Sequence, residues 1–202
     1  MLACGALAGD LRAVLAADGL ASRVDIDFLP ANLHNRPDAI APALRPMLQA
    51  AVESGRPVFV AYADCGTGGG LDALLLEFPG VQRLPGAHCY EVLAGSQLFA
   101  SLHEEELGTF YVTDFLARHF EALVWRGLGL DRHPELRNAY FGNYRRLVLL
   151  SQATDREVVT QAQAAAARLG LAFEHRPVGR GGLSEPLVAF VDRAQAQHAA
   201  AR

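Results

Sequence analysis

Residues 57–71, PVFVAYADCGTGGGL, decide the fold. Their first part, 57–62, is almost continuously apolar, which is typical of a parallel strand covered by helices on both faces. The glycine-rich segment 66–70 follows at once. Apolar residues then resume at helical spacing, at Leu71, Leu74, Leu75 and Phe78. The order of strand, glycine loop and helix is the repeating unit of an α/β fold.

The same alternation extends along the rest of the chain. Further strands are predicted at 2–4, 24–29, 81–84, 110–112, 146–150 and 171–174. Helices are predicted at about 7–19, 38–54, 92–99, 115–125, 133–144, 155–169 and 187–200. This rhythm predicts a three-layer, Rossmann-like α/β fold with a largely parallel sheet and helices on both faces. We expect a single domain over 1–202, with two lobes at about 1–107 and 108–202 as the alternative.

Bulk composition narrows the classes of function. The chain has 202 residues, 51% of them hydrophobic, and a net charge of -4, which favours a small-molecule substrate or a protein partner over nucleic acid. All its basic residues are arginine, so lysine-dependent phosphate loops, Schiff-base enzymes and pyridoxal enzymes are excluded. No charged leader or long apolar run is visible, which predicts a cytoplasmic protein without a membrane partner.

The three cysteines all fall where predicted strands end. Cys4 ends the first strand, Cys65 follows the third, and Cys89 follows the fourth. Ligands of open parallel sheets bind beyond the carboxyl ends of the strands, so we expect the three sulfurs to share one edge. The same rule adds further polar residues to that edge: His34, Asp64, His88, Asp114 and Gln152.

Thiols and imidazoles gathered at one edge are typical ligands of a thiophilic metal. Cys4, Cys65 and Cys89, with His88 or His34 as a fourth ligand, predict a zinc site, with an iron-sulfur cluster as the less favoured occupant. The alternative is that the cysteines are small buried hydrophobic residues, as most free cysteines are.

A catalytic thiol is a second alternative. Cys65 and Cys89 each precede a predicted helix, where free amide donors stabilise a thiolate. Cys65 is then the nucleophile, and Asp64 orients a ligand or a histidine. Asp64 acting only as a cap of the turn is equally compatible with the pattern.

The glycine loop has two interpretations. Backbone amides at Gly66, Thr67, Gly68 and Gly69 would approach an anionic cofactor or the anionic end of a substrate. The spacing matches neither a dinucleotide fingerprint nor a phosphate loop, so no particular nucleotide is predicted. The other interpretation is a tight turn that needs positive φ angles.

The chain resembles the DUF1638 family, a domain of unknown function, from Cys4 to about Leu150. The resemblance is carried by these segments: Ala3-Cys4-Gly5-Ala6-Leu7, Leu33-His34, Tyr62, Cys65-Gly66-Thr67-Gly68, His88-Cys89, Gly95-Ser96 and Gly108-Thr109-Phe110-Tyr111. The family pattern His-Asp-Cys is shortened here to His88-Cys89. The resemblance implies a link to corrinoid-dependent methyltransferases of one-carbon metabolism, and a corrinoid contact in place of a metal.

Three functional hypotheses follow. The first is a metal-binding protein of methyl-transfer metabolism, whether or not it is an enzyme. The second is a non-catalytic accessory protein that docks on a corrinoid or methyltransferase protein. The third is a metal-free enzyme with a cysteine nucleophile. An aromatic cluster predicted on helices is compatible with a core or with a contact between copies in a homo-oligomer: Trp125, Tyr140, Phe141 and Tyr144.

Overall fold

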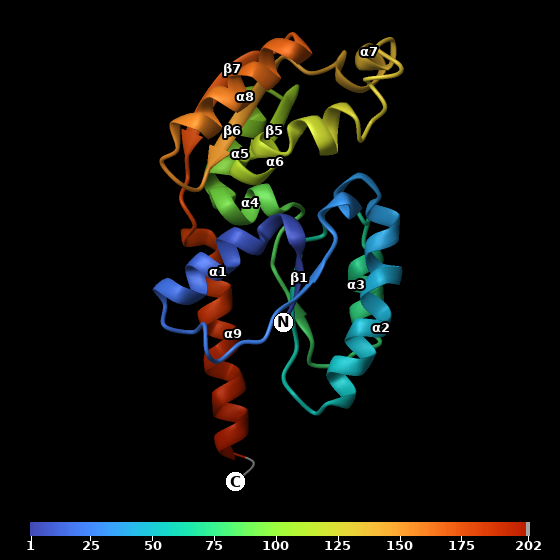
Figure 1. The fold of residues 1–202 in the computed structure, drawn as a ribbon. Helices are drawn as coiled ribbons and strands as arrows, with labels where there is room; N and C mark the ends of the chain where they lie inside the picture. Colours follow the sequence, from blue (N-terminus) through green and yellow to red (C-terminus); the bar gives the residue numbers. More distant parts are fainter. Residues whose placement is uncertain (201–202) are drawn as a thin grey trace. The chain divides into compact units, whose positions relative to one another are not determined.

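The computed structural model divides the chain into two compact units (Figure 1). The first unit consists of Met1–Val92 and the chain from Arg180 onward, and the second of Leu93–Gly179. The structure describes the backbone of residues 1–200 and the side chains of residues 1–196. The single-domain prediction stays a prediction.

The first unit is built on a parallel sheet with the strand order β2-β1-β3-β4. The strands are short: β1 (Leu2–Cys4), β2 (Asp27–Leu29), β3 (Phe59–Ala61) and β4 (Gln82–Arg83). Leu2 is in register with Asp27 on one side and with Val60 on the other. The carboxyl ends of β1, β3 and β4 therefore lie next to one another at one edge.

Helices cover both faces of this sheet. The helices α2 and α3 lie on one face, and α1 and α9 on the other (Figure 1). Their bounds are α1 (Ala8–Ala17), α2 (Ile40–Glu53), α3 (Gly70–Leu75) and α9 (Gly181–Ala200), with short 3-10 turns η1 (Gly5–Leu7), η2 (Ala31–Asn35) and η3 (Pro37–Ala39). Leu44 and Leu48 of α2 pack on Val60 in the core. Phe190 of α9 contacts Phe59, with 5.1 Å between the ring centroids.

The second unit has its own parallel sheet, in the order β5-β6-β7. Its elements are α5 (Ser96–Glu105), β5 (Thr109–Thr113), α6 (Asp114–Arg118), the π-helix η4 (Glu121–Trp125), α7 (Leu136–Phe141), β6 (Arg146–Ser151), α8 (Arg156–Leu169) and β7 (Ala172–Pro177). The helix α4 (Cys89–Ala94) leads into this unit. Asp155 caps α8, because its carboxylate accepts a hydrogen bond from the Glu157 amide at 2.9 Å.

The α/β prediction is confirmed, with parallel strands and helices on the sheet faces. The structure differs in having two sheets, because β4 offers only Gln82–Arg83 for pairing and β5 pairs with β6 instead. As a consequence, Asp114 and Gln152 directly follow β5 and β6 of the second sheet, where the Asp114 amide donates to the Gln152 side chain at 3.0 Å. Their predicted place beside the cysteines in one sheet is corrected by this division.

Within residues 1–200, no helix is long and apolar enough to cross a membrane.

Candidate thiol site

The three cysteine side chains lie together at the carboxyl edge of the first sheet. Cys4 ends β1, Cys65 follows β3, and Cys89 begins α4 just after β4. The Cys65 and Cys89 thiols are hydrogen-bonded, and both are close enough to Cys4 to interact electrostatically. All three are free and partly exposed. The neighbouring order of β1, β3 and β4 thus brings three remote segments to one place.

Cys65 is the thiol of this site that ionises first. Its pKa is lowered mainly by the hydrogen bond from the Cys89 thiol, with further donation from the backbone amides of Cys89 and Ala63. Donating this hydrogen bond raises the pKa of Cys89, because deprotonation of Cys89 would break the bond. Burial and then the negative charge of Cys65 raise the pKa of Cys89 further. When the pair loses its first proton, the negative charge is therefore favoured on Cys65, while Cys89 keeps its proton.

Tyr62 follows β3 directly and belongs to the site. Its hydroxyl is buried beside the Cys4 thiol, and no nitrogen or oxygen atom of the described residues bonds it. Burial raises the pKa of the Tyr62 hydroxyl, and the nearby Cys4 charge raises it further. Burial also raises the pKa of Cys4. Both groups keep their protons near neutral pH, so Tyr62 can donate toward sulfur.

From the sequence, Tyr62 was predicted at the end of a strand and as part of the family resemblance, but it was not predicted as a site residue. A polar aromatic residue at the end of an otherwise aliphatic run is the signal that could have marked it, because a buried hydroxyl needs a partner.

The backbone at Cys65 is strained. Its φ angle is +51°, and among residues 1–200 it is the only residue other than glycine with a positive φ. The left-handed conformation is unfavourable for a residue with a Cβ atom, and such strain clusters at functional sites. The Cys65 amide donates to the Ala87 carbonyl at 2.8 Å, which ties the loop after β3 to the loop after β4. This bond holds the Cys65 sulfur beside Cys89.

Asp64 closes the glycine loop. Its carboxylate accepts hydrogen bonds from the Thr67 hydroxyl at 2.5 Å, the Gly68 amide at 3.1 Å and the Gly69 amide at 3.0 Å. These donors lower the pKa of Asp64, with the Thr67 bond as the largest cause. The Gly68 and Gly69 amides that were predicted to bind an anion are thus bonded within the loop. The arrangement favours the turn interpretation, with Asp64 as the cap, over anion binding at 66–69.

The two predicted site histidines, His34 and His88, both lie near Tyr90. His34 lies in η2, and its Nε2 atom is 3.5 Å from the Tyr90 hydroxyl. His88 is exposed, and its ring centroid lies 6.4 Å from that of Tyr90. The surrounding chain lowers the pKa of His34 by desolvation, and the proximity of His88 lowers it further. At neutral pH His34 is therefore a neutral imidazole.

The family model described as "Protein of unknown function (DUF1638)" matches residues 28–186, which is more than half of the chain. The chain belongs to the DUF1638 family. The matched range includes Cys65 and Cys89 as well as His34 and His88, and it begins after Cys4. It continues beyond Leu150, where the sequence resemblance was expected to end. Comparison of this DUF1638 chain with curated proteins and with solved structures finds no match.

The predicted metal ligands of this DUF1638 protein do not form a ligand set. Among the side chains of residues 1–196, no group of three or more Cys, His, Asp or Glu residues is arranged to hold a metal ion. Tetrahedral zinc needs its donors about 2.0–2.3 Å from a common centre, and three thiols at one edge do not suffice for that. The zinc and iron-sulfur assignments are therefore not supported by the geometry and stay predictions.

Proposed function

We propose that this DUF1638 protein acts through a thiolate at Cys65 that attacks an electrophilic small molecule. The observation that carries the proposal is the hydrogen bond from the Cys89 thiol to Cys65, which lowers the pKa of Cys65. A thiolate, and not a thiol, is the nucleophile, so this bond raises the reactive fraction near neutral pH. The new bond joins the Cys65 sulfur to the electrophilic atom, and the leaving group departs with the bonding electron pair.

The neighbours of Cys65 have separate roles in this proposal. Cys89 stabilises the thiolate and keeps its own proton, so it is a positioning residue. Asp64 shapes the loop that holds Cys65 in the left-handed conformation. Tyr62 and Cys4 supply weak proton donors next to the sulfur, where negative charge develops on a leaving group.

The family resemblance implies a link to one-carbon metabolism, and this link suggests which electrophile Cys65 attacks. We propose a methyl donor, because a thiolate accepts a methyl group by direct displacement at carbon. Methylcobalamin is the donor to test: the S–CH3 bond forms as the Co–C bond breaks, and cob(I)alamin leaves with the bonding electron pair. Incubation with methylcobalamin is followed by mass spectrometry of the intact chain. A mass increase of one methyl group on wild type, absent from Cys65→Ser, supports it. An unchanged mass in both proteins rejects this donor and leaves the nucleophile proposal to its own test.

Alkylation with iodoacetamide at pH 7 tests the nucleophile. We expect Cys65 to be labelled first, ahead of Cys4 and Cys89, when the native protein is digested and each thiol is quantified by mass spectrometry. Hydrogen bonds to charged groups contribute about 1.5–3 kcal/mol, and part of the gain in thiolate is offset by lower nucleophilicity. Cys89→Ala should therefore slow Cys65 labelling about tenfold.

Two further variants control this experiment. Cys89→Ser keeps a hydroxyl donor and should recover part of the labelling rate. Cys4→Ala should leave the rate nearly unchanged, because iodide leaves without needing a proton. Far-UV circular dichroism checks that each variant is folded. Equal labelling of the three thiols, or a Cys65 rate that does not respond to Cys89, would contradict the proposal.

A metal centre is the second candidate, because three thiols that interact with one another are donors that thiophilic metals prefer. It requires the side chains to rearrange from the positions described. Zinc analysis after purification without chelator decides the matter. Stoichiometric zinc in wild type that is lost in Cys65→Ser supports a metal centre, and trace zinc in both removes it.

A further inference from the structure

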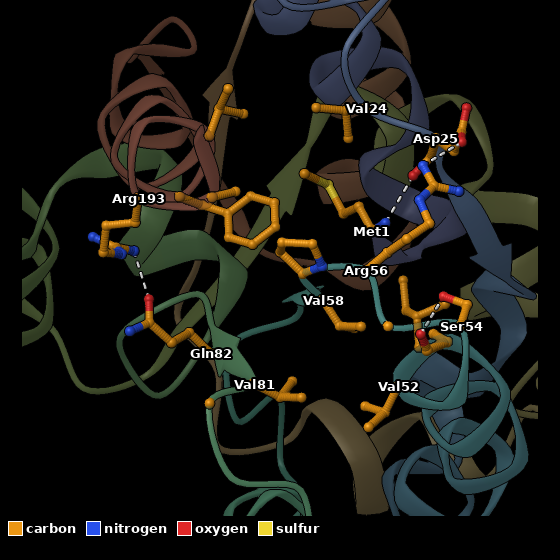
Figure 2. A pocket seen from close by; sticks show the side chains of 18 of the residues that line it. Met1, Val24, Asp25, Val52, Ser54, Arg56, Val58, Val81, Gln82 and Arg193 are labelled. Carbon is orange, nitrogen blue, oxygen red and sulfur yellow. Dashed lines mark hydrogen bonds and ion pairs between the residues drawn. The ribbon is translucent and has the colours of Figure 1, made fainter. Parts of the chain in front are cut away.

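A large cavity opens on the first unit (Figure 2). It lies at the edge of the sheet opposite the thiols. Its volume is about 1190 Å³. The residues that line it include Asp25, Pro57 and Gln82, which stand at or just before the starts of β2, β3 and β4. Small-molecule sites typically occupy roughly 300–1,000 Å³, so this cavity has room for a ligand of that size.

The cavity is separate from the thiol site. A strand of three residues, such as β1 or β3, spans about 10 Å, and this length of sheet separates the cavity from the cysteines. The cavity lies at the amino ends of the strands, whereas the cysteines lie at the carboxyl ends. A ligand in the cavity therefore occupies different side chains from a substrate at Cys65.

The wall of the cavity is more apolar than polar, and its apolar part is mainly aliphatic. Val24, Val52, Val58 and Val81 face the opening from four different segments (Figure 2), and Phe190 of α9 also lines it. A wall of this kind holds an apolar body by burying its surface from water. It is poorly suited to a nucleotide, whose phosphates need many polar donors.

The rim of the cavity carries more positive than negative side chains. Its arginines are Arg23, Arg56 and Arg193, and its acids are Asp25 and Asp27. Arg56 pairs with Asp25 at 2.6 Å on one side of the opening, and Arg193 bonds the Gln82 side chain on the other (Figure 2). Among the described side chains, neither Arg23 nor Arg193 has a carboxylate partner. In a chain with a net charge of -4, this local surplus favours an anion.

We propose that this cavity binds a small amphipathic anion, a carboxylate carried on an aliphatic or aromatic body. The apolar body lies against the valines and Phe190, and the carboxylate lies at the rim beside Arg193 or Arg23. A guanidinium binds a carboxylate through two parallel hydrogen bonds, which gives the rim its selectivity for this head group. The proposal is independent of the chemistry at Cys65.

Octanoate is the probe, measured by isothermal titration calorimetry on the full chain. We expect saturable binding at one site. Val52→Trp places a bulky ring at a cavity-lining residue that is 41% exposed and should weaken binding about tenfold or more. Leu76→Trp is the matched control, because Leu76 is 84% exposed and does not line the cavity. It should leave the affinity unchanged.

The head group is tested with octan-1-ol, which has the same chain without the charge. Arg193→Gln should weaken octanoate about two- to fivefold, as expected for an exposed charge, and leave octan-1-ol unaffected. The proposal is overturned if octanoate does not saturate, or if the two tryptophan variants behave alike. It is also overturned if octan-1-ol binds as tightly as octanoate.

Discussion

Substitution of Cys65 by glycine should stabilise the protein relative to substitution by alanine. Both variants remove the thiol and its hydrogen bond to Cys89, so their difference isolates the backbone. At a φ of +51°, a Cβ atom costs about 1–2 kcal/mol that glycine does not pay. Glycine gains more entropy in the unfolded chain, which offsets about 0.4–1 kcal/mol of this difference.

The expected net effect is that Cys65→Gly is more stable than Cys65→Ala by about 0.5–1 kcal/mol. For a chain of this size, this corresponds to an increase in Tm of about 1–4 °C. Urea and thermal unfolding followed by far-UV circular dichroism measure both quantities. Equal stability, or a more stable alanine variant, would show that the left-handed backbone at Cys65 is not a source of strain.

Ala87→Gly is the matched control for this experiment. Ala87 lies in the adjacent loop, accepts the hydrogen bond from the Cys65 amide, and does not have a positive φ. Glycine at this position should therefore destabilise the protein by about 0.4–1 kcal/mol, the opposite sign to that expected at residue 65. The same sign at both positions would indicate a general effect of glycine, unrelated to the backbone conformation.

Two further predictions concern the surroundings of the thiol site. Gly5→Ala would place a Cβ atom 2.7 Å from the Leu29 carbonyl oxygen, so it should cost about 1–3 kcal/mol in urea unfolding. A Cβ atom at Gly9 in α1 would have no neighbouring atom within 4 Å, so Gly9→Ala should stabilise the protein by about 0.5–1 kcal/mol. A loss of stability in both variants would contradict the packing argument. Asp64→Asn should destabilise by about 1–2 kcal/mol at neutral pH, because it removes charge-assisted hydrogen bonds. The pKa of Asp64 in the folded protein is lowered below 3.8, so the stabilisation by its carboxylate is complete above the unfolded pKa and is lost as the pH falls through the folded pKa. A difference in unfolding free energy between wild type and Asp64→Asn that does not narrow below about pH 4 would contradict this assignment.

The sequence predicted the local elements and the convergence of the cysteines well. The apolar run 57–62, the glycine loop and the helix that follows depend on local patterns, so each element was found within a few residues. Strand direction then places Cys4, Cys65 and Cys89 at one edge, whatever the details of packing. Asp155 at the start of α8 is a similar case, because a cap acts within its own turn.

Tertiary structure alone decided what these residues do at that edge. Whether Asp64 points to a ligand or to its own loop depends on the turn formed by Thr67 and Gly68. The amino-acid sequence of the loop is compatible with both interpretations. The hydrogen bond of Cys89 to Cys65 and the left-handed backbone of Cys65 arise from contacts between loops after different strands. Residues that are distant in the chain set these angles, so no local pattern carries them.

The division into two sheets and the cavity at the amino edge are likewise properties of the assembled chain. Periodicity predicts that a strand exists, but the partner it pairs with depends on the competing edges, and β5 pairs with β6 because β4 offers two residues only. The cavity is bounded by segments from β2, β3, β4 and α9, of which the last lies more than a hundred residues away in the chain. Local sequence therefore determined the elements and their direction, whereas packing between remote segments determined side-chain partners, backbone strain and empty space.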